Sequence, residues 1–140
     1  MLSITPAMEL VMALSSLQSR LLKKTDLSLS AHGISFTEFM VMYHLNAAPS
    51  KTMRRIDLAE SIGLSASGVT RLLIPMEKIK LVQKEANPRD ARVSLVKLSK
   101  TGERVFKEAF VSVEESANSS TQPLDSRQLA KFLQLAKVLV

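Results

Sequence analysis

The sequence contains no cysteine and only two histidines, His32 and His44. Without cysteine, the chain cannot form disulfides, thiolate zinc sites, iron–sulfur clusters, a cysteine nucleophile or a thiol redox switch. Two histidines are too few for a dedicated metal site. A glycine-rich phosphate loop and a nucleophile–base constellation are also missing. We therefore predict a protein that is not an enzyme and that has no cofactor and no metal.

Long apolar runs are missing as well. None approaches the roughly 18 consecutive apolar residues of a membrane span. The first residues, MLSITPAMEL, lack the basic region with which a signal peptide begins. These patterns predict a cytoplasmic protein with no membrane partner.

The length and the hydrophobic content indicate one folded domain over residues 1–140. Hydrophobic residues make up 46% of the 140 residues, which is enough for a core and argues against disorder. The net charge is +6, and its distribution is uneven. The segment 51–104 holds 12 basic and 6 acidic residues, whereas the two flanks together hold 7 of each. A basic middle segment favours a polyanion partner, although a lysine-rich solvated surface is the simpler alternative.

Apolar spacing predicts mainly helices. Helical patterns cover about 5–24, a second segment capped by Ser35 or Thr37, and then 53–62 and 65–80. Two segments rich in β-branched residues, 81–86 and 91–98, indicate a hairpin. Ser99 caps a helix that we expect to end near Ala117, before a polar break at 118–123. A last helix, capped by Asp125 or Ser126, runs to the end of the chain.

The segment IDLAESIGLSASGVTRLL, residues 56–73, has the pattern of a helix-turn-helix. A small residue at Ala59 lets two helices cross closely, and Gly63 tolerates the positive φ of a sharp turn. Leu64 and Val69 fill the angle between the helices, and Ser65 caps the second helix. An ordinary corner between two helices is the alternative, but the basic excess and the following hairpin favour DNA binding.

The second helix of this motif leaves one face free near its N-terminus. Such helices insert that end into the major groove of DNA. Serine and threonine hydroxyls can bond phosphates or bases, and Arg71 can bond guanine with two hydrogen bonds. Arg71 could equally be a structural ion-pair partner, and Ser65 is better suited to capping than to base contact. The predicted major-groove residues are Ser65, Ala66, Ser67, Gly68, Thr70 and Arg71.

The hairpin tip reads NPRDAR, residues 87–92. Asn87 and Pro88 suit a type I turn. Arg89 and Arg92 offer guanidinium groups to a narrow, electronegative minor groove. Asp90 repels phosphate, which makes sense if it pairs with Arg92 and orients that side chain. We expect Arg89, Asp90 and Arg92 at the minor groove, and backbone contacts from Arg54, Arg55 and Lys84.

The segment 58–102 resembles the DNA-binding lobe of the MarR family of winged helix-turn-helix transcriptional regulators. The resemblance rests on Leu58-Ala59, Gly63-Leu64-Ser65, Val69-Thr70-Arg71-Leu72, Leu81-Val82, Asp90-x-Arg92 and the exit LVKLSKTG. It covers about a third of the chain by motif. It implies a mainly α fold with a small β-hairpin wing (α+β), with a DNA-binding lobe at 35–99 and dimerisation helices at 5–30 and 100–140.

The same resemblance implies palindromic double-stranded DNA as partner, a homodimer, and repression that a small-molecule effector relieves. Family pockets point to Phe39, Tyr43 and His44 as effector contacts, although these residues could simply belong to the core. Three positions depart from the family pattern. Ala91 stands where the family often has a basic residue, Pro75 lies inside the recognition helix, where we expect a bend, and Lys80 stands where glycine often ends that helix.

The last helix is apolar around most of its circumference and therefore needs burial. Docking against a second copy would supply it, and packing within one chain is the alternative. The leading functional hypothesis is a homodimeric DNA-binding regulator. A winged-helix module that binds another protein is the alternative, because a fold does not determine a function.

Overall fold

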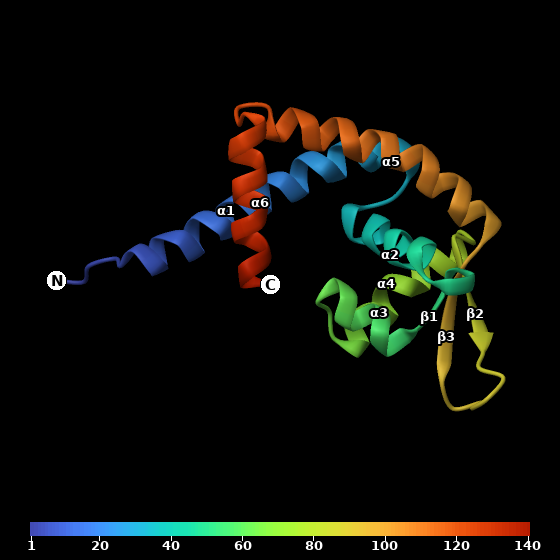
Figure 1. Ribbon diagram of the computed structural model, residues 1–140. Coiled ribbons are helices and arrows are strands. Elements are labelled where there is room, and N and C mark those ends of the chain that lie inside the picture. The colour runs from blue at the N-terminus through green and yellow to red at the C-terminus, as the bar shows by residue number, and fades with distance from the viewer.

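A computed structural model describes all 140 residues, and Figure 1 shows its architecture. The helices and strands follow in the order α1 (Pro6–Leu29), η1 (Ser30–His32), α2 (Phe36–Ala47), η2 (Pro49–Lys51), β1 (Thr52–Arg54), α3 (Arg55–Ile62), α4 (Ala66–Lys78), β2 (Val82–Ala86), β3 (Ser94–Leu98), α5 (Lys100–Thr121) and α6 (Ser126–Leu139). The predicted fold class, mainly helical with a small hairpin wing, is confirmed.

The elements from α2 to β3 form a compact lobe, and α1 and α5 run side by side along one edge of it (Figure 1). The N-terminal part of α1 projects away from the lobe, and α6 turns back from the end of α5. None of the helices combines the length and the apolar character that crossing a membrane requires.

Serine and aspartate caps begin most of the helices. Ser35 accepts from the backbone N–H of Glu38, and the Glu38 carboxylate accepts from the Ser35 N–H, which is a capping box. Ser99 caps α5, and Asp125 caps α6. Of the alternatives that the sequence left open, Ser35 and Asp125 are therefore the caps.

Two predicted helix ends were too early. Helix α1 continues past Lys24 to Leu29, and α5 continues past Ala117 to Thr121. The polar residues at 118–121 stay helical, and the Thr121 hydroxyl donates to the carbonyl of Ala117. Polar residues of moderate helix propensity continue a helix that is already formed, because each added residue gains one backbone hydrogen bond.

The sheet has three antiparallel strands in the order β1-β3-β2. The sequence predicted helix from residue 53, but Thr52–Arg54 pairs instead with Leu95–Lys97 of β3. The hairpin register runs from Val82 opposite Leu98 to Ala86 opposite Ser94. Strand β3 starts at Ser94 rather than at residue 91, because two turn hydrogen bonds, Asp90 N to Asn87 O and Val93 N to Asp90 O, hold the preceding residues.

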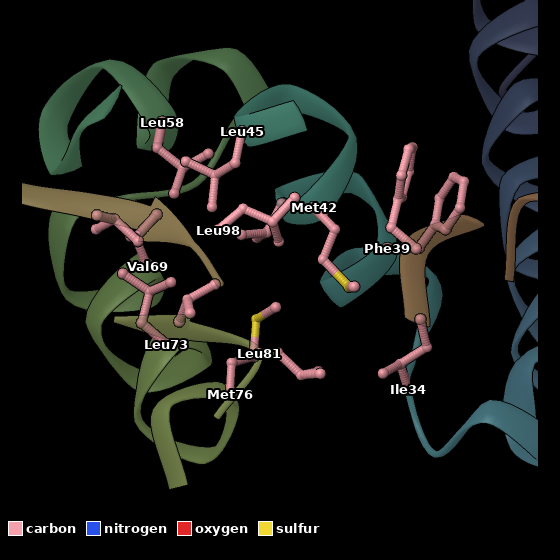
Figure 2. Packing of buried hydrophobic residues seen from close by; sticks show 14 of the residues in the cluster. Ile34, Phe39, Met42, Leu45, Leu58, Val69, Leu73, Met76, Leu81 and Leu98 are labelled. Carbon is pink, nitrogen blue, oxygen red and sulfur yellow. The ribbon is translucent and has the colours of Figure 1, made fainter. Parts of the chain in front are cut away.

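A single cluster of 17 buried residues forms the core of the lobe, and Figure 2 shows most of them. Leu45 of α2 points toward Leu58 of α3, and the sulfur-bearing side chains of Met42 and Met76 face each other across the centre. Phe39 stacks on Phe106 of α5 with ring centroids 5.2 Å apart. This stacking joins the lobe to α5.

The two end helices contribute almost nothing to this core. Only Leu29 is buried in α1, and α6 buries no residue at all. Large apolar side chains stay exposed on both helices, among them Met8, Val11, Leu27, Phe132, Leu133, Leu135 and Val138. One copy of the chain therefore leaves apolar helix faces uncovered.

Candidate nucleic-acid interface

Helices α3 and α4 form the predicted helix-turn-helix. Ala59 of α3 is buried, and α3 packs against α4. Gly63 adopts a left-handed φ of 70°, and the N–H of Leu64 donates to the carbonyl of Ala59 over 3.0 Å. This is the Schellman arrangement that satisfies the last carbonyls of a helix. The turn therefore depends on the glycine at position 63, as the sequence predicts.

Ser65 caps α4, since its hydroxyl accepts from the N–H of Gly68 over 3.0 Å. The hydroxyl of Ser67 lies 3.2 Å from that of Ser65. The Ser65 oxygen therefore has partners within the chain before any DNA is present, which agrees with its expected capping role. Ser67 is exposed.

The inner side of α4 packs on the core through Val69, Leu73 and Met76 (Figure 2). We call the opposite side, near the start of the helix, the α4 N-terminal face; it comprises Ala66, Ser67, Gly68, Thr70 and Arg71. Ala66, Ser67 and Arg71 are exposed, whereas Gly68 and Thr70 are partly buried. The helix continues through Pro75 to Lys78, so the proline lies two turns beyond the start of this face.

Arg71 is exposed and forms no ion pair within the chain. Arg71 is therefore not a structural ion-pair partner, which was the alternative role. A guanidinium group on an exposed helix face is free to bind an external acceptor.

Arg54, the last residue of β1, and Arg55, the first residue of α3, have different environments. Arg54 forms two hydrogen bonds to the carboxylate of Asp57, over 2.8 and 3.0 Å. This contact lowers the pKa of Asp57, chiefly through the hydrogen bond, and raises the pKa of Arg54. Arg55 is partly buried and donates from Nη1 to the hydroxyl of Thr70 over 2.9 Å. Sequence reasoning did not find this contact, because no local pattern links residues 15 positions apart.

The hairpin of β2 and β3 carries the wing loop, residues 87–93, at its tip (Figure 1). Asn87 accepts the N–H of Arg89 through its side-chain oxygen over 2.9 Å. Asp90 accepts both the backbone N–H of Arg92, over 3.0 Å, and its Nε, over 3.2 Å. These bonds, the backbone bond most of all, lower the pKa of Asp90. The predicted Asp90–Arg92 pair is therefore present.

The wing cations remain accessible. The side chain of Arg92 is 91% exposed although it is paired with Asp90. Arg89 and Lys84 are also exposed, and neither forms an ion pair within the chain. The hairpin thus presents three cations to the outside, one of which is oriented by a carboxylate.

The predicted effector residues of α2 have unlike surroundings. Phe39 is 4% exposed and belongs to the core, which is the alternative that the sequence left open. Tyr43 is 46% exposed, and its ring meets that of His44 edge-on with centroids 5.2 Å apart. The Nε2 atom of His44 is buried and has no hydrogen-bond partner. Of the three, only His44 has an unused buried polar atom.

Comparisons with known proteins agree with this geometry. The model of the MarR family matches residues 34–94. The chain is 25% identical over 114 residues to the uncharacterized HTH-type transcriptional regulator YhbI of Bacillus subtilis, covering 81% of the chain and 73% of YhbI. It is 26% identical over 94 residues to the transcriptional repressor MprA of Escherichia coli, covering 67% of the chain and about half of MprA, 53%.

Solved structures share the fold at low sequence identity. Sco3205 of Streptomyces coelicolor, a MarR family regulator solved in complex with DNA, has a TM-score of 0.88 at 18% identity, covering 99% of this chain and 89% of that one. A mutant of MarR from E. coli, complexed with operator DNA, has a TM-score of 0.88 at 20% identity, covering 96% of this chain and 95% of that one. None of these relatives is named as an enzyme. The chain therefore carries a MarR family domain at residues 34–94, and its fold is that of MarR family transcriptional regulators of known structure.

Proposed function

We propose that this regulator is a homodimer that binds a palindromic operator in double-stranded DNA and represses transcription. The observation that carries the proposal is the α4 N-terminal face, where Arg71 is exposed and forms no ion pair within the chain. The repressor MprA and the DNA-bound structures of similar fold support the same function.

Each α4 would enter a major groove by its N-terminal end. Ala66, Ser67, Gly68, Thr70 and Arg71 would lie nearest to the bases, with Ser65 serving as cap. Arg71 suits a bidentate contact with guanine. The two half-sites would lie about one helical turn apart, so that both recognition helices of a dimer meet the same side of the duplex.

The wing would reach the minor groove beside each half-site. Arg92, oriented by Asp90, and Arg89 would contribute positive charge there, and Lys84 would contact the backbone. Arg54 is exposed and remains a candidate for a phosphate contact, although its guanidinium group already forms an ion pair with Asp57. Arg55 is less suited to that role, since its guanidinium group is directed to Thr70.

Two copies would meet through segments 5–30 and 100–140, leaving residues 35–99 as the DNA-binding lobe. The support is the uncovered apolar surface of α1 and α6, together with the absence of any buried residue in α6. An isolated chain would expose that surface to water at a cost of roughly 25 cal/mol per Å². Association of two copies would remove it.

A small-molecule effector remains part of the proposal, on the strength of the family resemblance. His44 is the residue best suited to contact it, because its buried Nε2 lacks a partner. Tyr43 lies beside it and is accessible. A ligand with one hydrogen-bonding group near an aromatic ring would fit such a pair.

Binding to a promoter fragment across a salt series tests the DNA-binding proposal. With about six phosphate contacts in a dimer, the logarithm of the binding constant should fall against that of salt with a slope of roughly −5. A flat dependence, or no shift of any duplex, would contradict direct DNA binding. It would favour the alternative of a winged-helix module that binds another protein.

A further inference from the structure

Thr70 lies on the α4 N-terminal face, but its hydroxyl group is already bonded within the chain. The hydroxyl donates its proton to the carbonyl of Ala66 over 3.1 Å, and it accepts from Nη1 of Arg55 over 2.9 Å. A hydroxyl group has one proton to donate. Thr70 therefore cannot donate to a phosphate oxygen, to guanine or to thymine O4 unless the bond to Ala66 breaks.

Arg55 keeps this contact in an unfavourable setting. Its positive charge lies in the first turn of α3, where the helix dipole disfavours cations. Its Nε–H is buried without a partner, which costs free energy. The bond to Thr70 is the only side-chain hydrogen bond that this guanidinium forms. The Arg55 side chain is therefore placed to orient Thr70 rather than to stabilise α3.

With the oxygen turned toward Ala66 and Arg55, the γ-methyl is the group of Thr70 that is left for an outside partner. Thr70 follows Ala66 and Ser67 by four and three residues, so these side chains lie together on one side of the helix. In the major groove, thymine alone presents a C5-methyl group, and a threonine methyl is a recognised partner for it.

Resting on the proposed DNA-binding function, we propose that Thr70 determines specificity by contacting a thymine methyl group, and that Arg55 is the positioning residue that directs Thr70 to do so. The contact is apolar, so it discriminates thymine from bases that lack the methyl group. It is distinct from the hydrogen bonds that Arg71 would make to guanine.

The test compares thymine with uracil, which differ only by that methyl group. Duplexes that the wild-type protein recovers from a randomised library are resynthesised with deoxyuridine replacing one thymine at a time. We expect one position per half-site at which this replacement weakens wild-type binding about fourfold, the effect of losing one buried methyl group. Other thymines should show little change.

Two variants of Thr70 make the assignment. Thr70→Ser keeps the hydroxyl group and removes the methyl, so it should lose the thymine-to-uracil difference at that position. Thr70→Val removes the hydroxyl group, but its stiff β-branched side chain holds a methyl group on this face without help from Arg55, so it should retain the difference. A wild-type protein that is indifferent to deoxyuridine everywhere, or a Thr70→Ser variant that still discriminates, overturns the proposal. A library from which no duplex is recovered overturns the DNA-binding function itself.

Arg55 is tested by Arg55→Met and Arg55→Lys, with thermal unfolding recorded for both. A lysine ammonium can still donate to Thr70, whereas methionine cannot. Arg55→Lys should keep the thymine-to-uracil ratio, and Arg55→Met should reduce it toward one. This ratio compares two duplexes on the same protein, so a general loss of stability does not change it. An unchanged ratio in Arg55→Met removes the positioning role.

Discussion

Gly102, in the first turn of α5, lies directly against the backbone carbonyl of Leu81 at the start of the hairpin. A Cβ atom on Gly102 would overlap that carbonyl oxygen, and it would lie 2.6 Å from Cδ1 of Leu98. The Ser99 hydroxyl lies at the same junction, 3.0 Å from the Leu81 oxygen. The wing and α5 therefore approach each other as closely as only glycine allows.

Gly102→Ala should lower the free energy of unfolding by about 2–3 kcal/mol, because the backbone of the hairpin must move to accommodate the methyl group. Gly68→Ala is the matched control. Gly68 occupies the same third position of α4 behind a serine cap, and its added Cβ would meet Ser65 Oγ at 3.2 Å. It should change stability by less than about 1 kcal/mol. Chemical denaturation at one protein concentration measures both, and equal effects would contradict the close approach.

Lys80→Gly should stabilise the protein. Lys80 has a left-handed φ of 63°, and the N–H of Leu81 donates to the carbonyl of Met76 over 2.9 Å. This is a Schellman ending with lysine where glycine is usual. Relief of the left-handed side chain is worth about 1 kcal/mol. Lys78→Gly, inside the same helix, should instead destabilise by about 1 kcal/mol. Thermal unfolding of both variants measures whether each change raises or lowers the stability. A Lys80→Gly variant that is less stable than the wild type would contradict the prediction.

Asp90 gives the wing a definite pH dependence. Because the folded-state pKa of Asp90 lies below its ordinary value of 3.8, its bonds stabilise the wing fully above pH 3.8, and that contribution is lost as the pH falls through the lower folded value. An NMR titration of the Asp90 carboxyl carbon measures this pKa. In Arg92→Ala the backbone N–H of residue 92 remains, and its hydrogen bond to Asp90 is the larger cause of the lowered pKa. The pKa should therefore rise only part of the way, and a value of 3.8 or above would contradict this assignment.

Arg92→Ala should weaken operator binding by about tenfold, since a groove contact by arginine is worth about 1–3 kcal/mol. Arg89→Ala should have a smaller effect and reduce the salt slope by about one, as a phosphate contact does. Asp90→Asn separates orientation from simple charge. It removes a negative charge next to DNA, yet it should weaken binding if Asp90 orients Arg92. Fluorescence anisotropy at two salt concentrations gives all three values, and tighter binding by Asp90→Asn would remove the orienting role.

Phe132→Glu in α6 should convert the proposed dimer into monomers. It places a charge on an exposed apolar helix face that a second copy would bury, which should raise the dissociation constant by about a hundredfold or more. Lys131→Glu, on the neighbouring position, is the control for added negative charge. Sedimentation equilibrium distinguishes the two species. A dimer that persists in Phe132→Glu would place the interface elsewhere.

Much of the lobe follows from local sequence. Gly63 and the caps that Ser65 and Ser99 form act within four residues of the backbone groups that they satisfy, so these roles could be predicted from the sequence. Lys80, which stands where the family often has glycine, adopts the left-handed conformation in place of that glycine. The Asp90–Arg92 pair spans two residues and was predicted for the same reason.

The errors have a common cause. Strand β1 forms because it pairs with the edge of β3, where Val96, the partner of Met53, comes 43 positions later. Three residues carry too little pattern to indicate a strand. The ends of α1 and α5 lie further along than the apolar pattern suggested, because polar residues continue a helix that is already formed, and the two helices pack side by side. The sequence left open whether Phe39 belongs to the core, because Phe106, on which it stacks, comes much later in the chain.

By itself, the sequence determined the helix-turn-helix, its caps and its charged wing, because those features depend on interactions between near neighbours in the chain. Only the tertiary structure decided that Arg55 bonds the hydroxyl of Thr70 and that Gly102 meets the carbonyl of Leu81. Both contacts join residues at least 15 positions apart. Their geometry exists only after the helices and the hairpin have packed around a common core.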